Sequence, residues 1–309
     1  MEPSTQPGSD ARADIVRTYR PIGELVPAHW EQGDIPANGI TQRYYRTGGD
    51  RPAVVLLHGF MEGALAWLPT ARTLEPDYDV VMLDARGHGD SARVAGDFAA
   101  DVLVADAAAA ITALGLQDVR LLGFSQGAAT AALLTDRHPD LIRGVILAGL
   151  AEGGAPAGDM LNAPGYREWL AAYTAWLAGL KTQNHTERML ASLSQIPPFA
   201  PIPSEDEYVA WVENSAKLDL DMVGMGNSMW ETLAETVQAQ EAAIARLRCP
   251  ALLMKSAASP VSSGPLTLRE EASEHPNVTI LHFENTGHLI YRDRFETFIS
   301  QTRAFFARI

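Results

Sequence analysis

The chain has 309 residues, 47% of them hydrophobic, and a formal net charge of -14 at pH 7. This length and apolar content suit one large α/β domain with a sizeable insertion. The acidic balance argues against a nucleic-acid partner, because binding a phosphate backbone requires a basic surface.

The first residues and the single cysteine restrict where the protein can act. As the single cysteine, Cys249 cannot form an internal disulfide, and we interpret it as a small structural side chain. Residues 1–13 are polar and predicted to be disordered, with no apolar stretch typical of a secretory signal or membrane anchor. We therefore expect a cytoplasmic protein with no membrane partner.

Short apolar runs alternate with helix-like segments along the chain. Asn38-Gly39 predicts a tight turn between two short extended stretches. Short continuous apolar runs that alternate with helices predict a mostly parallel sheet covered by helices on both faces. The predicted strands are Ala53–Leu57, Val80–Leu83, Val119–Leu122, Val145–Leu147, Ala251–Met254 and Val278–Phe283, followed by a helix from about Phe295.

The alternation of predicted strands and helices stops after Leu150. Residues 153–246 contain several helical stretches and no convincing strand, which predicts a helical cap inserted into the sheet domain. The predicted organisation is therefore an α/β core of residues 14–152 and 247–309 with a cap of residues 153–246.

The strongest motif is Gly123-Phe124-Ser125-Gln126-Gly127, between a predicted strand and a helix-forming run. A strand that turns sharply into a helix strains the central residue, and flanking glycines remove side chains that would clash. The pattern alone also occurs by chance in turns. Its strand–turn–helix context favours Ser125 as an exposed nucleophile near the positive end of a helix.

A second motif, His58-Gly59-Phe60-Met61-Glu62-Gly63, follows the strand Ala53–Leu57. A loop at this position can bring a main-chain amide opposite the nucleophile, to form an oxyanion hole with the amide after the serine. We assign these donors to Phe60 and Gln126. The His58 side chain is interpreted as a structural turn residue.

The general base is predicted at His288, in the Gly287-His288 loop after the strand Val278–Phe283. Of the eight histidines, only this one combines a late position, a loop after a strand and the order in which the nucleophile precedes the base. The alternative is an exposed loop histidine with no catalytic role.

Together these motifs resemble the α/β-hydrolase superfamily. The resemblance rests on Leu57–Phe60, Asp84–Ser91, Gly123–Gly127 and Gly287-His288, and covers about residues 40–150 and 247–309. It implies that Asp84, Arg86 and His88 belong to a structural loop rather than to the chemistry. Serine at position 125 fits poorly with the haloalkane dehalogenases and epoxide hydrolases, which use an aspartate nucleophile.

The sequence departs from the superfamily at the third catalytic residue. The resemblance places an aspartate after the penultimate strand, where this chain has Ser259. The orienting acid holds the histidine tautomer, so an active enzyme needs a substitute. Glu152 is the first choice, although an exposed loop glutamate is about equally expected there. Asp219 and Asp221, one of which suits a helix cap, are the second option, and Glu62 is the third.

An Ala-Ala-Ser-Pro loop without the usual acid also resembles the lactonases that open zearalenone-type macrolactones, which implies a glutamate after the earlier strand. Aromatic and thioether side chains of the predicted cap suit an apolar pocket, although most could simply pack it onto the core. The candidate substrate contacts are Met61, Trp176, Trp211, Met222 and Met225.

The sequence thus predicts a serine hydrolase whose small-molecule substrate is a medium-sized, apolar or aromatic ester or lactone. It predicts no cofactor or metal, because no clustered metal-ligand spacing occurs. Two alternatives stay open: a ligand-binding homologue with weakened catalysis, and a cofactor-independent oxygenase or C–C bond hydrolase. Homo-oligomerisation is compatible with the sequence.

Overall fold

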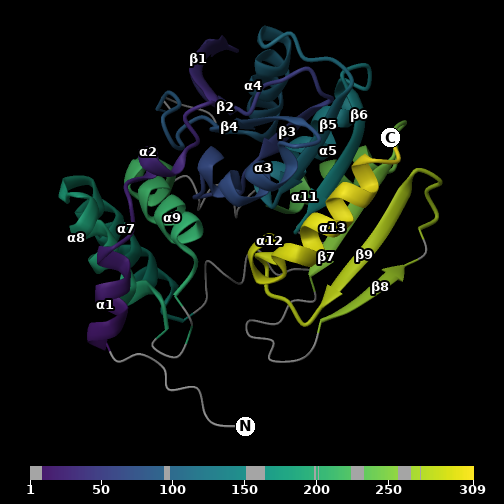
Figure 1. The fold of residues 1–309 in the computed structure, drawn as a ribbon. Coiled ribbons are helices and arrows are strands. Elements are labelled where there is room, and N and C mark those ends of the chain that lie inside the picture. Colours follow the sequence, from purple (N-terminus) through teal and green to yellow (C-terminus); the bar gives the residue numbers. More distant parts are fainter. Residues whose placement is uncertain are drawn as a thin grey trace.

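A single nine-stranded sheet forms the centre of the protein (Figure 1). The computed structural model describes residues 9–93, 98–150, 164–197, 200, 202–223, 233–256, 266–271 and 273–309. The strands are β1 (Glu31–Ala37), β2 (Ile40–Arg46), β3 (Ala53–Leu57), β4 (Asp79–Leu83), β5 (Val119–Phe124), β6 (Ile142–Ala148), β7 (Ala251–Ser256), β8 (Thr267–Glu271) and β9 (Val278–Glu284).

The order across the sheet is β1-β2-β4-β3-β5-β6-β7-β9-β8. The strands from β4 to β9 in this order pair in parallel, whereas β1, β2 and β8 run antiparallel to their neighbours. The predicted parallel sheet is therefore confirmed. Asn38 and Gly39 form the predicted turn between β1 and β2, with φ of 46° and 79°. β8 was not predicted, because its Thr-Leu-Arg-Glu-Glu sequence is mostly exposed and polar.

Alternate side chains of the central strands enter two separate cores. In β3, Val54 and Leu56 join the core under α3 (Leu68–Leu74) and α13 (Phe295–Phe306), whereas Val55 and Leu57 face the opposite layer. That layer contains α4 (Ala100–Ala113), α5 (Gln126–Arg137) and α11 (Leu233–Ile244). Helices on both faces explain why the strands read as continuous apolar runs.

Between β6 and β7 the described residues form helices and no strand. Three of these helices lie beside the sheet domain in Figure 1: α7 (Tyr166–Thr182), α8 (His185–Ser192) and α9 (Glu205–Lys217). We call α7, α8 and α9 the inserted helices. Asn184 and Ser204 form capping boxes that start α8 and α9. Shorter elements are α2 (Ile22–Leu25), η1 (Ala64–Trp67), η2 (Leu193–Gln195) and α12 (Ile290–Asp293).

Two boundaries differ from the sequence prediction. α1 (Ser9–Arg17) is helical over residues predicted to be disordered, and Arg12 donates a hydrogen bond to the Pro197 carbonyl oxygen at 3.3 Å. Its partner is distant in sequence, so local composition could not reveal it. α11 packs on α5 with Ala243 in the core of the sheet domain, so it belongs to the core layer although the prediction placed it in the cap. No described helix is long and apolar enough to cross a bilayer.

Candidate active site

Three loops carrying the predicted residues leave the carboxyl ends of parallel strands. Ser125 directly follows β5, residues 58–63 follow β3, and His288 lies four residues beyond β9. Carboxyl ends of parallel strands meet at one edge of a sheet, which is where ligands bind in open α/β folds. The topology therefore brings together segments that are up to 230 residues apart in sequence.

Ser125 has the strained backbone expected at a strand-to-helix turn. Its φ is 51° and its ψ is -114°, and the turn is held by its amide, which donates to the Ala148 carbonyl oxygen at 2.9 Å. A Cβ at Gly123 would lie 2.2 Å from the Gly127 carbonyl oxygen, and one at Gly127 would lie 2.3 Å from the Leu57 carbonyl oxygen. Both glycines are therefore required for the chain to turn this tightly.

Gly127→Ala should destabilise the protein by about 3 kcal/mol, because the added methyl group meets main-chain atoms at the end of β3 that cannot move aside cheaply. Urea unfolding measures the change. Gly179→Ala in α7 is the matched control, since a Cβ there meets nothing within 4 Å and should leave stability equal or slightly higher. Equal midpoints for the Gly127→Ala variant and the parent would contradict this close packing.

Ser125 and His288 are in direct contact. The Nε2 atom of His288 lies 3.2 Å from the Ser125 Oγ, within hydrogen-bond distance. The imidazole packs against Phe124, with ring centroids 4.9 Å apart. Partial burial lowers the pKa of His288, and the negative charge of Glu62 opposes that shift. A histidine with a lowered pKa is neutral at pH 7 and can accept the serine proton.

The two predicted oxyanion donors come from segments that touch each other. Gln126 is the first residue of α5, and Gly127 behind it lies against the end of β3, from which Phe60 follows three residues later. Met61 has a φ of 63°, which turns the loop sharply after Phe60. These positions suit two main-chain amides on either side of Ser125.

Two buried histidines connect the loop after β3 to the loop after β4. His58 Nδ1 lies 2.8 Å from the Gly59 carbonyl oxygen, and its Nε2 accepts the Ala85 amide at 3.0 Å. His88 Nδ1 lies 2.9 Å from the Arg86 carbonyl oxygen, and its Nε2 accepts the Met61 amide at 3.2 Å. Each ring therefore needs the neutral form with its proton on Nδ1. The predicted structural role of His58 fits this geometry, and His88 supports the strained Met61.

The candidate acids occupy different places. Asp219 is buried and caps a turn, with its Oδ1 accepting the Asp221 amide at 3.2 Å, while Asp221 is exposed. Neither contacts His288 among the interactions of the described residues. Glu152 and Ser259 lie outside the described residues.

Glu62, the third candidate acid, forms a buried cluster with two residues that the sequence analysis did not identify. Its Oε2 accepts the Gly59 amide at 2.9 Å, and its Oε1 accepts the Tyr291 hydroxyl and, at 3.2 Å, the Arg292 guanidinium. The signal available in the sequence was an aromatic and a basic residue three and four positions after His288.

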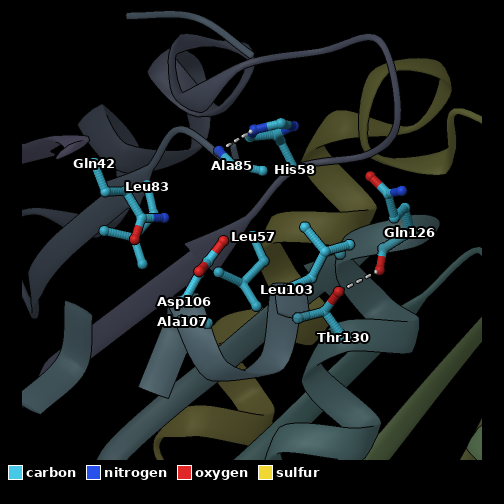
Figure 2. A pocket seen from close by; sticks show the side chains of 11 residues that line it. Gln42, Leu57, His58, Leu83, Ala85, Leu103, Asp106, Ala107, Gln126 and Thr130 are labelled. Atoms are coloured by element: carbon cyan, nitrogen blue, oxygen red, sulfur yellow. Dashed lines mark hydrogen bonds between the residues drawn. The ribbon is translucent and has the colours of Figure 1, made fainter. Parts of the chain in front are cut away.

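A small cavity lies behind the Ser125 turn, between β3, α4 and α5 (Figure 2). Its volume is about 30 Å³, room for roughly two water molecules and far too little for an ester substrate. Its wall includes Gln42, whose Oε1 is buried without a partner among the described residues, and Thr130, whose hydroxyl donates to the Gln126 carbonyl oxygen at 3.0 Å.

Helix α7 and residues 218–223, which follow α9, contribute an apolar cluster next to the loop after β3. Leu177, Leu218, Met222 and Val223 form its buried centre, and Phe60, Met61, Phe98 and Trp176 are among the side chains packed around it. Trp211 stacks on Trp176 with ring centroids 5.6 Å apart. The structure thus gathers four of the five predicted substrate contacts, while Met225 lies outside the described residues.

Comparisons with known proteins agree with this architecture. Residues 52–295 match the family described as alpha/beta hydrolase fold. N-formylmaleamate deformylase of Pseudomonas putida is 40% identical over 97 residues, 31% of this chain and 36% of that protein. Human serine hydrolase BPHL is 33% identical over 120 residues, 37% of this chain and 41% of that protein. The matched segments thus span well under half of these curated relatives.

Solved structures extend the likeness to nearly the whole chain. The N-formylmaleamic acid deformylase of Pseudomonas putida S16 superposes with a TM-score of 0.65 at 19% identity, covering 87% of this chain and 99% of that one. An E-2-(acetamidomethylene)succinate hydrolase superposes with a TM-score of 0.62 at 18% identity, covering 90% of this chain and 100% of that one. With the match over residues 52–295, this chain belongs to the α/β-hydrolase family.

Proposed function

We propose that this hydrolase cleaves a carboxylic ester or lactone of an apolar or aromatic substrate through an acyl-enzyme on Ser125. The observation that carries the proposal is the 3.2 Å contact between Ser125 Oγ and His288 Nε2 at a strained strand-to-helix turn. A neutral imidazole at this distance can take the hydroxyl proton as the oxygen attacks a carbonyl carbon.

The proposed reaction has two acyl-transfer steps. His288 takes the Ser125 proton, the serine oxygen attacks, and the amides of Phe60 and Gln126 stabilise the oxyanion. The tetrahedral intermediate collapses to an acyl-serine, and the imidazolium gives its proton to the leaving alcohol. Water, deprotonated by His288, then attacks the acyl-serine, and the imidazolium returns the proton to the Ser125 oxygen as the carboxylic acid leaves.

Glu152 remains the proposed orienting acid. The chain that leaves β6 passes close to the imidazole. A Cβ added at Gly149 would lie only 3.3 Å from His288 Cε1. Glu152 follows only three residues later. A carboxylate from this segment would hold the Nδ1 proton and stabilise the imidazolium.

The apolar cluster around Met222 supports an apolar substrate, with the inserted helices acting as a cap over the site. The zearalenone-type macrolactone is one substrate of this kind. Amide cleavage is the second candidate function. It is favoured by the likeness to N-formylmaleamate deformylase and to the (E)-2-((N-methylformamido)methylene)succinate hydrolase of Acinetobacter baylyi, which is 34% identical over 107 residues.

Fluorophosphonate labelling combined with a substrate panel tests the proposal. We expect the probe to modify Ser125, located by peptide mass spectrometry, and a short aryl ester or aryl lactone to be hydrolysed faster than the matched N-formyl and N-acetyl amides. Faster amide cleavage would select the second function. Absence of labelling together with tight binding of an intact ester would favour a ligand-binding protein, and oxygen consumption would identify an oxygenase.

A further inference from the structure

The carboxylate of Glu62 is placed between the two loops that complete the candidate site. It lies in the turn after Phe60, and both of its oxygens are engaged: Oε2 by the Gly59 amide, and Oε1 by the side chains of Tyr291 and Arg292. Tyr291 and Arg292 belong to α12, which begins two residues after His288. One side chain therefore links the oxyanion loop to the short helix that follows the base.

The same two loops also meet on Phe124, the residue before the nucleophile. Its ring lies 4.9 Å from that of His288 and 5.0 Å from that of Tyr291, measured between centroids. A Cβ at Gly59 would approach this ring to 2.9 Å. Only small displacements of either loop are possible without a clash, so the Glu62 link fixes their separation in a tightly packed environment.

The Glu62 side chain is only 11% exposed, and Arg292 beside it is 21% exposed. An ion pair with Arg292 and hydrogen bonds from Gly59 and Tyr291 hold this carboxylate in place. Its charge also acts on the catalytic histidine, because it raises the pKa of His288 against the opposing effect of burial.

We propose that Glu62 is a positioning residue, which ties the oxyanion loop to α12 and stabilises the imidazolium of His288 during acyl transfer. Its oxygens are occupied by Gly59, Tyr291 and Arg292, so it acts through these groups and through its field rather than as the hydrogen-bonded acid of the triad. The proposal rests on the serine-hydrolase function proposed above.

The charged and titratable groups around His288 define what the test must separate. Glu62 acts on its pKa from the oxyanion loop, and Ser125 contacts it from the nucleophile turn. Tyr291 and Arg292 of α12 bind the Glu62 carboxylate. Asp293 accepts the Gly287 amide at 2.8 Å and so holds the start of the histidine loop.

Glu62→Gln removes the charge and keeps the side-chain shape. We expect kcat on a short aryl ester to fall about tenfold to a hundredfold, with KM changed less than about twofold, because the loops and the imidazolium lose support while the apolar pocket remains. The acid limb of kcat/KM should move to lower pH, since the imidazolium loses a nearby negative charge. A purely structural role would not move this limb.

Tyr291→Phe tests the hydrogen-bonded link between Glu62 and α12 separately from the charge of Glu62. It keeps the ring against Phe124 and the charge of Glu62 but removes one bond, so kcat should fall moderately while the acid limb stays within error of the parent. It also keeps the proposal testable if Glu62→Gln folds poorly. Glu75→Gln is the matched control, because Glu75 accepts the Trp30 indole proton far from the site and should leave kcat and the pH profile unchanged.

The outcomes distinguish the two proposals. A parent protein whose Ser125 is not labelled by a fluorophosphonate refutes the serine-hydrolase function. A labelled, active parent whose Glu62→Gln variant keeps both kcat and the acid limb refutes the role of Glu62 alone. Glu152→Gln, compared in parallel, should lower kcat by a larger factor at every pH if Glu152 is the orienting acid.

Discussion

Ser125→Ala is expected to lower kcat/KM for a short aryl ester by about 10⁴-fold to 10⁶-fold while the protein stays folded. The hydroxyl is the only group that the substitution removes, and its loss leaves His288 Nε2 without the proton donor that lies 3.2 Å away. Steady-state kinetics measure the rate, and circular dichroism with thermal unfolding checks the fold.

Ser125→Gly should be as inactive as Ser125→Ala but more stable by about 1 kcal/mol. Ser125 has a φ of 51°, which costs any residue with a Cβ and costs glycine little. This pair of variants separates chemistry from strain. The exposed Ser194 provides the control, as Ser194→Ala should keep full activity. Activity in Ser125→Ala near the parent rate would exclude the acyl-enzyme on Ser125.

Acid should destabilise the protein through His88, the second large effect. His88 is fully buried, and burial, reinforced by the neighbouring His58 at a ring distance of 5.1 Å, lowers its pKa to about 3. The unfolded chain takes up this proton near pH 6.5, where histidine ordinarily titrates, whereas the folded protein does not. The stability that the neutral ring contributes is therefore complete above about pH 6.5 and is lost as the pH falls toward 3.

The expected slope of this loss is about 1.4 kcal/mol of unfolding free energy for each pH unit below the ordinary histidine pKa. In the folded protein, protonation near pH 3 would place a proton on the Nε2 that accepts the Met61 amide, so the oxyanion loop should loosen only near that pH. Urea unfolding between pH 7.5 and 4.5 measures the slope. Activity regained on return to pH 7.5 would distinguish reversible unfolding from aggregation.

His88→Gln removes the titrating group and can retain an acceptor for the Met61 amide. Its unfolding free energy should be lower than that of the parent at pH 7.5 but should fall less steeply with acid. His138→Gln, at an exposed position after α5, should follow the parent curve. If the parent and His88→Gln lose stability in parallel, the acid sensitivity arises elsewhere, for example from paired carboxylates such as Asp106.

Local sequence patterns were sufficient to predict the central strands, but not the polar edge strand β8 or the helix α1. Six of the nine strands were predictable as short apolar runs, because helices cover both faces of a central strand and most of its residues are apolar. β8 was missed because an edge strand that is exposed and polar has no such pattern. The helix α1 was missed because its packing partner is α8, about 170 residues away in the sequence. The composition of α1 does not indicate that contact.

The sequence alone determined the fold class and selected Ser125 and His288. Both depend on local chemistry: glycines at a strained turn, a strand before it and a helix after it, and the order of nucleophile and base along the chain. Only the tertiary structure decided that these two side chains, 163 residues apart, are within hydrogen-bond distance. It also joined Glu62 to Tyr291 and Arg292 across 229 and 230 residues, and His88 to the strained loop at Met61. The physical reason is that periodicity and turn residues specify which surfaces must be buried, whereas the partner of each polar group depends on which loops meet once the sheet has formed.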